Sequence, residues 1–374
     1  MKDQPKPKKP GLWLRLFSPV FRPPYSPSNI KIDGKTALVT GTTSGVGLQT
    51  CRSLLAHGVS QLIMSARTQK KGEDVAASLR LLYPRANIQV WELEMESYDS
   101  VIAFAERALK DLKRLDMVIL NAGTLQANAY QAAYTEHEVM FQVNYLSTAL
   151  LARLFVPVLR KRSPKGVPGR LTVASTNIFT HEENRYDPPT WESMDSLARL
   201  RTKDINGRFL LEKFRLPGKL LQIVLYDLSR SVSRTEVIVN AVCNQYVRDT
   251  QLYDSIENTP PLHTGIRAVN ALVGKSLEQA AQSYIHAVAV EGNESHGEAI
   301  VNFRIQKRKY DERPRNWRIF EEDLLDRTGR EFRQLFAGKS TIGSWLYIAM
   351  ESGCTIDETI GKYPYLVTGW SDIV

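Results

Sequence analysis

Between residues 35 and 305, short apolar runs alternate with longer segments of helical periodicity. The runs are nearly continuous in valine, isoleucine, leucine and methionine, as in strands that are buried on both faces of a sheet. They cover residues 35–40, 61–67, 87–94, 115–123, 169–176, 236–243 and, as a last candidate, 298–305. One of the segments between them places apolar residues at intervals of four and three, which lines one face of a helix: Val101, Ala105, Ala108 and Leu112. This alternation predicts an α/β fold, a doubly wound parallel sheet of the Rossmann type in a three-layer αβα arrangement.

Composition divides the 374-residue chain into three parts. Residues 1–34 form a basic, proline-rich tail, whose apolar run GLWLRLFSPVF is interrupted by Arg15 and is too short to span a bilayer. Residues 35–305 hold the alternating pattern. Residues 306–374 are polar and helix-prone, and we expect them to be a C-terminal extension rather than a second catalytic domain.

The net charge of +9 comes from two peripheral segments. Residues 1–35 contain eight Lys/Arg against two Asp, and residues 304–318 contain seven Lys/Arg against two acids, so the body of the chain is nearly neutral. No basic stripe or reading motif for nucleic acid is present. We interpret both segments as solvated surface, and the alternative for the tail is weak attraction to an anionic membrane surface.

The cysteines Cys51, Cys243 and Cys354 are far apart, without a CxxC pair or a His/Cys cluster at metal-ligand spacing. This predicts a reduced, cytoplasmic protein without a metal site.

A glycine-rich turn follows the first predicted strand, in the segment VTGTTSGVGLQ. Its three glycines have GxxxGxG spacing between a strand and a helix, where a tight turn needs residues without a Cβ. Backbone amides at the start of that helix can hold a pyrophosphate. We therefore expect a dinucleotide site at this turn, built from Gly41, Thr43, Ser44, Val46 and Gly47, together with Gly45.

The end of the second predicted strand distinguishes the two pyridine nucleotides. An acidic residue there would select NAD through the ribose 2′-hydroxyl, but this chain has Arg67, followed by Lys70 and Lys71. Cations suit a 2′-phosphate, so NADP is the expected cofactor; the alternative for the lysines is the start of a solvated helix. Glu94 ends the third strand where a side chain can meet the adenine edge, or where it can cap the next helix.

The segments TGTTSGVG, NAG (121–123), VN (143–144) and VAST (173–176) occur in an order and spacing that resembles the short-chain dehydrogenase/reductase family. The resemblance covers residues 33–305. The lead-in RPPYSPSN, the segment ARTQKKGE and the late NESHGE are similar to a fungal, retinol-dehydrogenase-like branch, many of whose members act in secondary metabolism. It implies an NADP-dependent oxidoreductase acting on a small molecule.

The resemblance also implies roles for individual residues. Asn121 would lie beside the adenine ribose and stabilise the central strand, and Asn144 would hold a water at a helix kink that links the active-site lysine to solvent. The substrate-orienting hydroxyl would be Thr176 or Ser175, of which only one can point inward because a strand alternates its faces. The register favours Thr176.

The family's tyrosine and lysine lie four residues apart on a helix, so that the ammonium lowers the phenol's pKa. The segment RLPGK keeps Lys219 but has Arg215 in place of the tyrosine, and an arginine cannot usefully donate a proton. Pro217 suggests that the helix begins near this residue, since proline is tolerated in a first turn. The family's later Pro-Gly pair is replaced as well, by Asn244 and Gln245.

These departures leave several functions open. The first is an NADP-dependent oxidoreductase for a hydrophobic carbonyl, alcohol or conjugated alkene, in which Arg215 holds a developing enolate and Lys219 contacts both cofactor and catalytic site. His181 and Tyr186 are weaker candidates for a substitute acid. The alternatives are a non-redox isomerase or cyclase, and a catalytically silent binding protein. Relatives often dimerise through the helices that carry Asn144 and Lys219, which suggests a homodimer by analogy.

Overall fold

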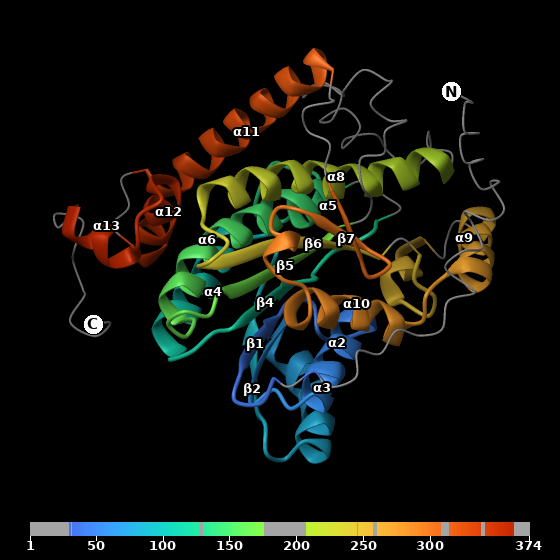
Figure 1. Cartoon of the computed structure of the whole chain (residues 1–374). Helices are drawn as coiled ribbons and strands as arrows, with labels where there is room; N and C mark the ends of the chain where they lie inside the picture. The colour runs from blue at the N-terminus through green and yellow to red at the C-terminus, as the bar shows by residue number, and fades with distance from the viewer. Residues whose placement is uncertain are drawn as a thin grey trace, which may run out of the picture.

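The computed structural model describes residues 30, 32–126, 130–175, 207–244, 246–256, 260–307, 314–337 and 341–362. Within these ranges, one eight-stranded sheet has the order β3-β2-β1-β4-β5-β6-β7-β8 (Figure 1). The strands are β1 (Thr36–Val39), β2 (Gln61–Ala66), β3 (Asn87–Glu92), β4 (Met117–Leu120), β5 (Gly169–Ser175), β6 (Val237–Cys243), β7 (Ala299–Val301) and β8 (Arg304–Gln306). Neighbours from β3 to β7 pair in parallel, and β8 is antiparallel to β7. The predicted α/β fold is confirmed.

Helices cover both faces of this sheet (Figure 1). Two separate hydrophobic cores define the two layers. One core lies under α2 (Gly45–Ala56), α3 (Gln69–Leu82) and α10 (Leu277–Ala289), and the other under α4 (Tyr98–Asp111), α6 (Thr148–Arg162) and α8 (Gly207–Ser231). The strand order reverses between β1 and β4. Doubly wound folds bind ligands beyond the carboxyl ends of the strands at such a point, and we call this region the crevice.

The remaining elements of the chain up to residue 307 lie between these strands and helices in sequence. They are α5 (Val139–Phe141), the π-helix η1 (Gln142–Ser147), the 3₁₀ helices η4 (Gln251–Ile256) and η5 (Asn293–Ser295), and α9 (Pro260–Val273). Local sequence fixes several helix starts. Ser97 accepts a hydrogen bond from the amide of Ser100 at the start of α4, and Ser276 and Gln279 form a reciprocal capping box on α10.

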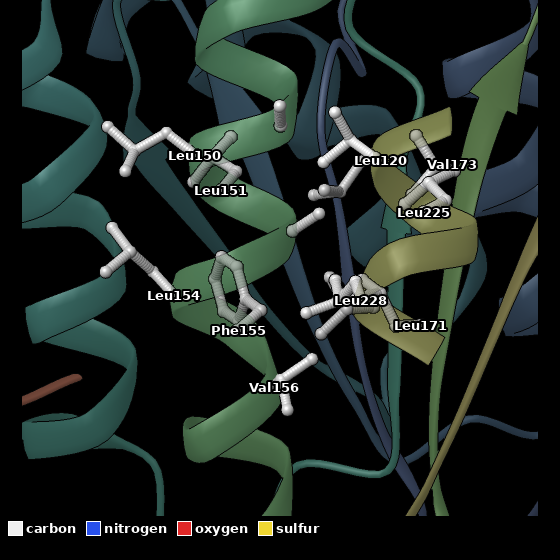
Figure 2. Packing of buried hydrophobic residues seen from close by; sticks show 14 of the residues in the cluster. Leu120, Leu150, Leu151, Leu154, Phe155, Val156, Leu171, Val173, Leu225 and Leu228 are labelled. Carbon is white, nitrogen blue, oxygen red and sulfur yellow. The ribbon is translucent and has the colours of Figure 1, made fainter. Parts of the chain in front are cut away.

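The helix α6 forms the centre of one core. Figure 2 shows its side chains packed among those of β4, β5 and α8: Leu150, Leu151, Leu154, Phe155, Val156, Leu120, Leu171, Val173, Leu225 and Leu228. Residues 139–162 are long and apolar enough to cross a membrane by length and composition, but 89% of the apolar window is buried inside the protein. The apolar character of this segment is therefore accounted for by its place in the core.

The expected single strand over residues 298–305 is wrong. The segment forms the hairpin β7–β8, with Val301 paired to Arg304 across a two-residue turn. The turn residues Asn302 and Phe303 have φ of 50° and 60°, as a two-residue hairpin turn with positive φ at both positions requires. The asparagine tolerates this conformation, and the chain reverses there instead of continuing the strand.

The expected helix start near Pro217 is also wrong, because α8 already begins at Gly207 and runs on to Ser231. Pro217 lies inside the helix and is buried. A proline there removes one backbone hydrogen bond, a cost of about 3 kcal/mol. The apolar face that follows, with Leu220 and Val224 fully buried against the core, offsets this cost by packing.

The last described segment adds three helices to the α6 side of the molecule: α11 (Arg315–Phe336), α12 (Ile342–Ser352) and α13 (Ile356–Lys362). In Figure 1, α11 lies across α8, and α12 packs on α6 and α4. Trp345 of α12 is 1% exposed, and Phe336 stacks on Tyr347 with ring centroids 4.8 Å apart. The helices that this helix-prone segment forms thus cover the α6 layer.

Candidate active site

The turn between β1 and α2 accepts only glycine at two of its positions. A Cβ on Gly47 would lie 2.0 Å from the carbonyl oxygen of Gly41, and a Cβ on Gly41 would lie 2.8 Å from Cα of Ala122. Gly41 and Gly45 also have positive φ, 68° and 55°, a region that side chains disfavour. The backbone here is packed so closely that any side chain would fill the turn.

This turn presents hydrogen-bond donors to the crevice. The first three residues of α2, Gly45, Val46 and Gly47, have amide groups without intrahelical acceptors. Ser44 is the N-cap and its side chain makes no capping hydrogen bond to them, and Thr43 precedes it. A glycine cradle with amides at a helix start fits a pyrophosphate, so the residues present suit a dinucleotide.

The amide of Asn121 joins the glycine turn to the end of β4. Its Nδ2 donates to the carbonyl oxygens of Thr40 and Gly41, at 3.1 and 3.2 Å. In return, Oγ1 of Thr40 accepts from the backbone amides of Asn121 and Ala122, both at 3.0 Å. The expected strand-stabilising contact of Asn121 is present in this arrangement.

At the end of β2, Arg67 is largely exposed, with 70% of its side chain accessible. Its Nε lies 3.5 Å from Oε2 of Glu94, and Oε1 of Glu94 accepts from the amide of Glu96 at 3.0 Å. Glu94 therefore closes the turn before α4, whereas Ser97 is the N-cap of that helix. Lys71 is exposed in the first turn of α3, on the same edge as Arg67.

Asn144 lies in the π-helical turn η1, where the helix kinks. Its Oδ1 accepts from the amide of Thr124 at 2.8 Å, and its Nδ2 donates to the carbonyl oxygen of Thr124 at 2.7 Å. The side chain thus closes a two-bond ring with the segment that follows β4. Single π-helical turns occur frequently at functional sites, and this one is bonded to the segment that follows β4.

The hydroxyl of Ser175 is engaged by α8. It donates to the carbonyl oxygen of Gly218 at 3.0 Å and accepts from Nε2 of Gln222 at 2.6 Å. A substrate that used Ser175 would have to replace one of these bonds. Thr176, His181 and Tyr186 lie outside the described residues, so Thr176 stays a prediction.

Arg215 and Lys219 occupy one face of α8, one turn apart. Nη2 of Arg215 donates to the phenol oxygen of Tyr246 at 3.3 Å. Tyr246 follows β6 and the Asn244-Gln245 pair, of which Gln245 lies outside the described residues. Tyr246 was not among the residues predicted for the site, although a tyrosine directly after that pair was the available signal.

A second residue that was not predicted is Lys275, which is partly buried and precedes α10. Its Nζ donates to Oδ1 of Asn244 at 3.2 Å, and Nδ2 of Asn244 donates to the carbonyl of Ala280 at 3.1 Å. Burial lowers the pKa of Lys275 from 10.5 to about 8 and raises that of the neighbouring Cys243 thiol to about 12. A lysine with a lowered pKa beside the end of β6 is a signal that only the fold reveals.

The crevice thus collects side chains from the ends of β1, β4, β5 and β6 and from α8, which is typical of a cofactor and substrate site in a doubly wound fold. In the part of the chain that the structure describes, no group of three His, Cys, Asp or Glu side chains is placed to hold a metal ion. The arrangement can anchor a dinucleotide and offers a lysine, an arginine and a phenol beyond it.

Comparison with known proteins agrees with this geometry. A family model described as short chain dehydrogenase matches residues 35–177. A solved short chain oxidoreductase from Pseudomonas aeruginosa PAO1, described as NADPH-bound with an atypical catalytic center, superposes with a TM-score of 0.52 over 73% of this chain and 96% of that one, at 18% identity. That likeness concerns the fold alone.

Two fungal relatives are closer in sequence. The short chain dehydrogenase opdN of Penicillium oxalicum is 33% identical over 280 residues, covering 72% of this chain and 87% of the relative. The short chain dehydrogenase/reductase mfmJ of Annulohypoxylon moriforme is 36% identical over 308 residues, covering 81% and 87%. The chain therefore belongs to the short-chain dehydrogenase/reductase family and is an oxidoreductase that acts on a small molecule.

Proposed function

We propose that this protein is an NADP-dependent oxidoreductase for a hydrophobic carbonyl, alcohol or conjugated alkene of fungal secondary metabolism. The observation that carries the proposal is the glycine cradle at Gly41 and Gly47, with Arg67 beyond it. The cradle suits a pyrophosphate, and the exposed cation Arg67 directly after β2, where an acidic residue would select NAD, suits a 2′-phosphate.

The chain's own residues divide the binding of this cofactor. The amides of the first turn of α2 would hold the pyrophosphate, and Arg67 and Lys71 would bind the 2′-phosphate. Asn121 would lie beside the adenine ribose. Lys219 would reach the nicotinamide ribose from α8. When bound, the cofactor supplies the hydride, and the protein orients the substrate and moves the proton.

Apolar surroundings on the substrate side support a hydrophobic substrate. Leu216, the neighbour of Arg215 on α8, is partly buried against the core, as are Leu252 and Tyr253 after β6. Such side chains bind apolar ligand surface. The origin of opdN and mfmJ in fungi supports a role in fungal metabolism, and the secondary-metabolite substrate is our inference from the resemblance.

Two binding measurements and one turnover measurement test the proposal. NADPH and NADH are titrated into the purified chain by calorimetry, and loss of NADPH absorbance is followed with phenanthrenequinone as a carbonyl probe. We expect NADPH to bind more tightly than NADH and to be consumed in the presence of the quinone. Lys219→Ala should lower the rate of consumption. Binding without consumption across aromatic ketones and enones would favour the non-redox alternative, and absence of NADPH binding would refute the proposal.

We also propose a cytoplasmic location for the chain. Cys51, Cys243 and Cys354 are free thiols in the described ranges, which suits a reducing compartment. Fluorescence microscopy of the tagged full chain in a fungal host tests this, and a signal confined to an organelle would contradict it.

Two partner interactions remain predictions. The basic tail, which lies almost wholly outside the described residues, would make weak contact with anionic membranes, and cosedimentation with phosphatidylserine vesicles at low and high salt tests it. A homodimer through the helices that carry Asn144 and Lys219 would have to make room beside α12, which packs on α6, and beside α11, which packs on α8. Light scattering on the full chain decides between a dimer and a monomer.

A further inference from the structure

The place that the family's catalytic phenol would occupy is taken by an arginine in this chain. Arg215 lies four residues before Lys219 on α8, so the two side chains leave the same helix face one turn apart. An arginine cannot deliver a proton at working pH. A reduction that forms an alcohol therefore needs a proton donor from another element.

A phenol from the segment after β6 contacts Arg215. Tyr246 follows β6, and its hydroxyl oxygen accepts from Nη2 of Arg215 at 3.3 Å. The bond joins residues 31 positions apart in sequence. The hydroxyl group that α8 lacks is thus present beside α8, on a side chain from the β6 end.

The backbone around Tyr246 is held on both sides. The carbonyl oxygen of Tyr246 accepts from the amide of Lys275 at 2.9 Å, and the amide of Arg248 donates to the carbonyl of Lys275 at 3.0 Å. These bonds make Val247 and Lys275 an isolated parallel bridge. A functional side chain works best on a backbone that is fixed in this way.

The direction of the hydrogen bond leaves the proton of Tyr246 available. A guanidinium only donates, so the phenol oxygen is the acceptor in the bond to Arg215. The hydroxyl hydrogen of Tyr246 can then point to a further acceptor, such as a substrate oxygen.

The hydroxyl groups of two other tyrosines form hydrogen bonds to residues other than Arg215. Burial raises the pKa of Tyr253, and its hydroxyl is hydrogen-bonded by Asn270. Tyr145 is fully buried and its hydroxyl lies 2.7 Å from Oγ1 of Thr328 in the core. Tyr246 is partly buried, and its phenol oxygen accepts from Arg215.

We propose that Tyr246 is the proton donor of this enzyme and that Arg215 is the residue that positions it. The inference rests on the proposed carbonyl reduction and names the group that completes it. The substrate carbonyl carbon accepts a hydride from the reduced nicotinamide, and the π electron pair of the C=O bond moves to oxygen. The oxygen takes the proton of Tyr246, and the phenolate, facing Arg215, recovers a proton from water.

The first test is turnover of phenanthrenequinone with NADPH by three variants. Tyr246→Phe should lower kcat by about 10²–10⁴-fold, the usual contribution of a general acid, and leave the Kd for NADPH unchanged. Tyr134→Phe, which removes the phenol oxygen of a residue that is 69% exposed, should leave kcat unchanged. Arg215→Met should reduce kcat, and Arg215→Lys should restore part of it because an ammonium can still donate to the phenol.

The second test does not depend on turnover. Tyrosines are nitrated with tetranitromethane and mapped by mass spectrometry, with and without NADP⁺ plus phenanthrenequinone. Nitration of Tyr246 should be slowed by this mixture, whereas nitration of Tyr134, whose residue is 69% exposed, should not change.

The outcomes separate this inference from the proposed function. If the wild type consumes NADPH and Tyr246→Phe retains full kcat, Tyr246 is not the donor although the enzyme is a reductase. If Tyr246 is nitrated equally in both conditions, the assignment is overturned whether or not the quinone is reduced. If neither NADPH binding nor consumption occurs in the wild type, the proposed function itself fails.

Discussion

Oε1 of Glu331 lies 2.7 Å from Nε2 of His137. The same carboxylate oxygen accepts from the hydroxyl of Tyr98 at the start of α4. Glu331 belongs to α11, so one partly buried carboxylate fastens the C-terminal segment to α4 and to the segment before α5. It is the polar counterpart of the apolar contact between α12 and α6.

Replacing Glu331 by Ala should loosen α11. Two partners would lose their acceptor, a loss of about 1–3 kcal/mol in the free energy of unfolding, measured by urea denaturation. Hydrogen exchange of α11 should increase. Arg330→Ala is the control, because its ion pair with Asp326 is 58% exposed on both sides and contributes less than about 1 kcal/mol. Equal effects of the two variants would contradict an anchoring role for Glu331.

Gly47→Ala should abolish NADPH binding. The new methyl group would meet the carbonyl oxygen of Gly41 at 2.0 Å, so the turn must move and its amides with it. Calorimetric titration with NADPH measures the loss, and the melting temperature reports folding. Gly265→Ala is the matched control, since a Cβ there meets nothing within 4 Å. In that helix, alanine should add up to about 1 kcal/mol of stability. NADPH binding by Gly47→Ala with wild-type affinity would refute the pyrophosphate assignment.

Arg67→Ser should change the preference between the two nucleotides. Removing the exposed guanidinium deprives a 2′-phosphate of its cation, and we expect the Kd for NADPH to rise about tenfold, equivalent to roughly 1.4 kcal/mol. The Kd for NADH should stay the same, because NADH has no 2′-phosphate. Arg52→Ser removes one exposed charge from α2 and should alter neither constant. A parallel rise in both constants would show that Arg67 acts through the fold instead.

Lys275 should make stability depend on pH. Burial lowers its pKa from 10.5 to about 8 in the folded chain, so between these values the unfolded chain binds the extra proton. The free energy of unfolding should therefore rise with pH through this window, by at most about 3 kcal/mol, and be flat with respect to this group below it. Urea denaturation of wild type and Lys275→Met across the window isolates the contribution from those of other groups, including Cys243. Parallel curves would contradict the lowered pKa.

The sequence predicts the fold well where the signals are local. The glycine turn, the parallel strands β1 to β6 and the exposed Arg67 each follow from a few adjacent residues. Pro217 led to a wrong prediction of where the helix begins, because the packing that compensates for a proline involves residues far along the chain. The hairpin at Asn302 was missed for a different reason, since a continuous apolar run does not reveal a reversal.

The contacts that complete the candidate site could not be predicted in the same way. Arg215 and Tyr246 are 31 residues apart, as are Asn244 and Lys275. Each pair meets only because the sheet order brings the end of β6 next to α8 and to the start of α10. No periodicity in the sequence encodes such long-range contacts. The lowered pKa of Lys275 arises from the burial that accompanies them.

The cover that α12 provides for α6 comes from the same polypeptide. In an assembly that shields such a surface with a second subunit, dilution exposes it, and stability then depends on protein concentration. Here Leu346 and Met350 of α12, which share a core with α6, remain at the α6 face at any dilution. The apolar layer that supports the crevice is therefore protected at the low abundance at which a cell keeps many enzymes.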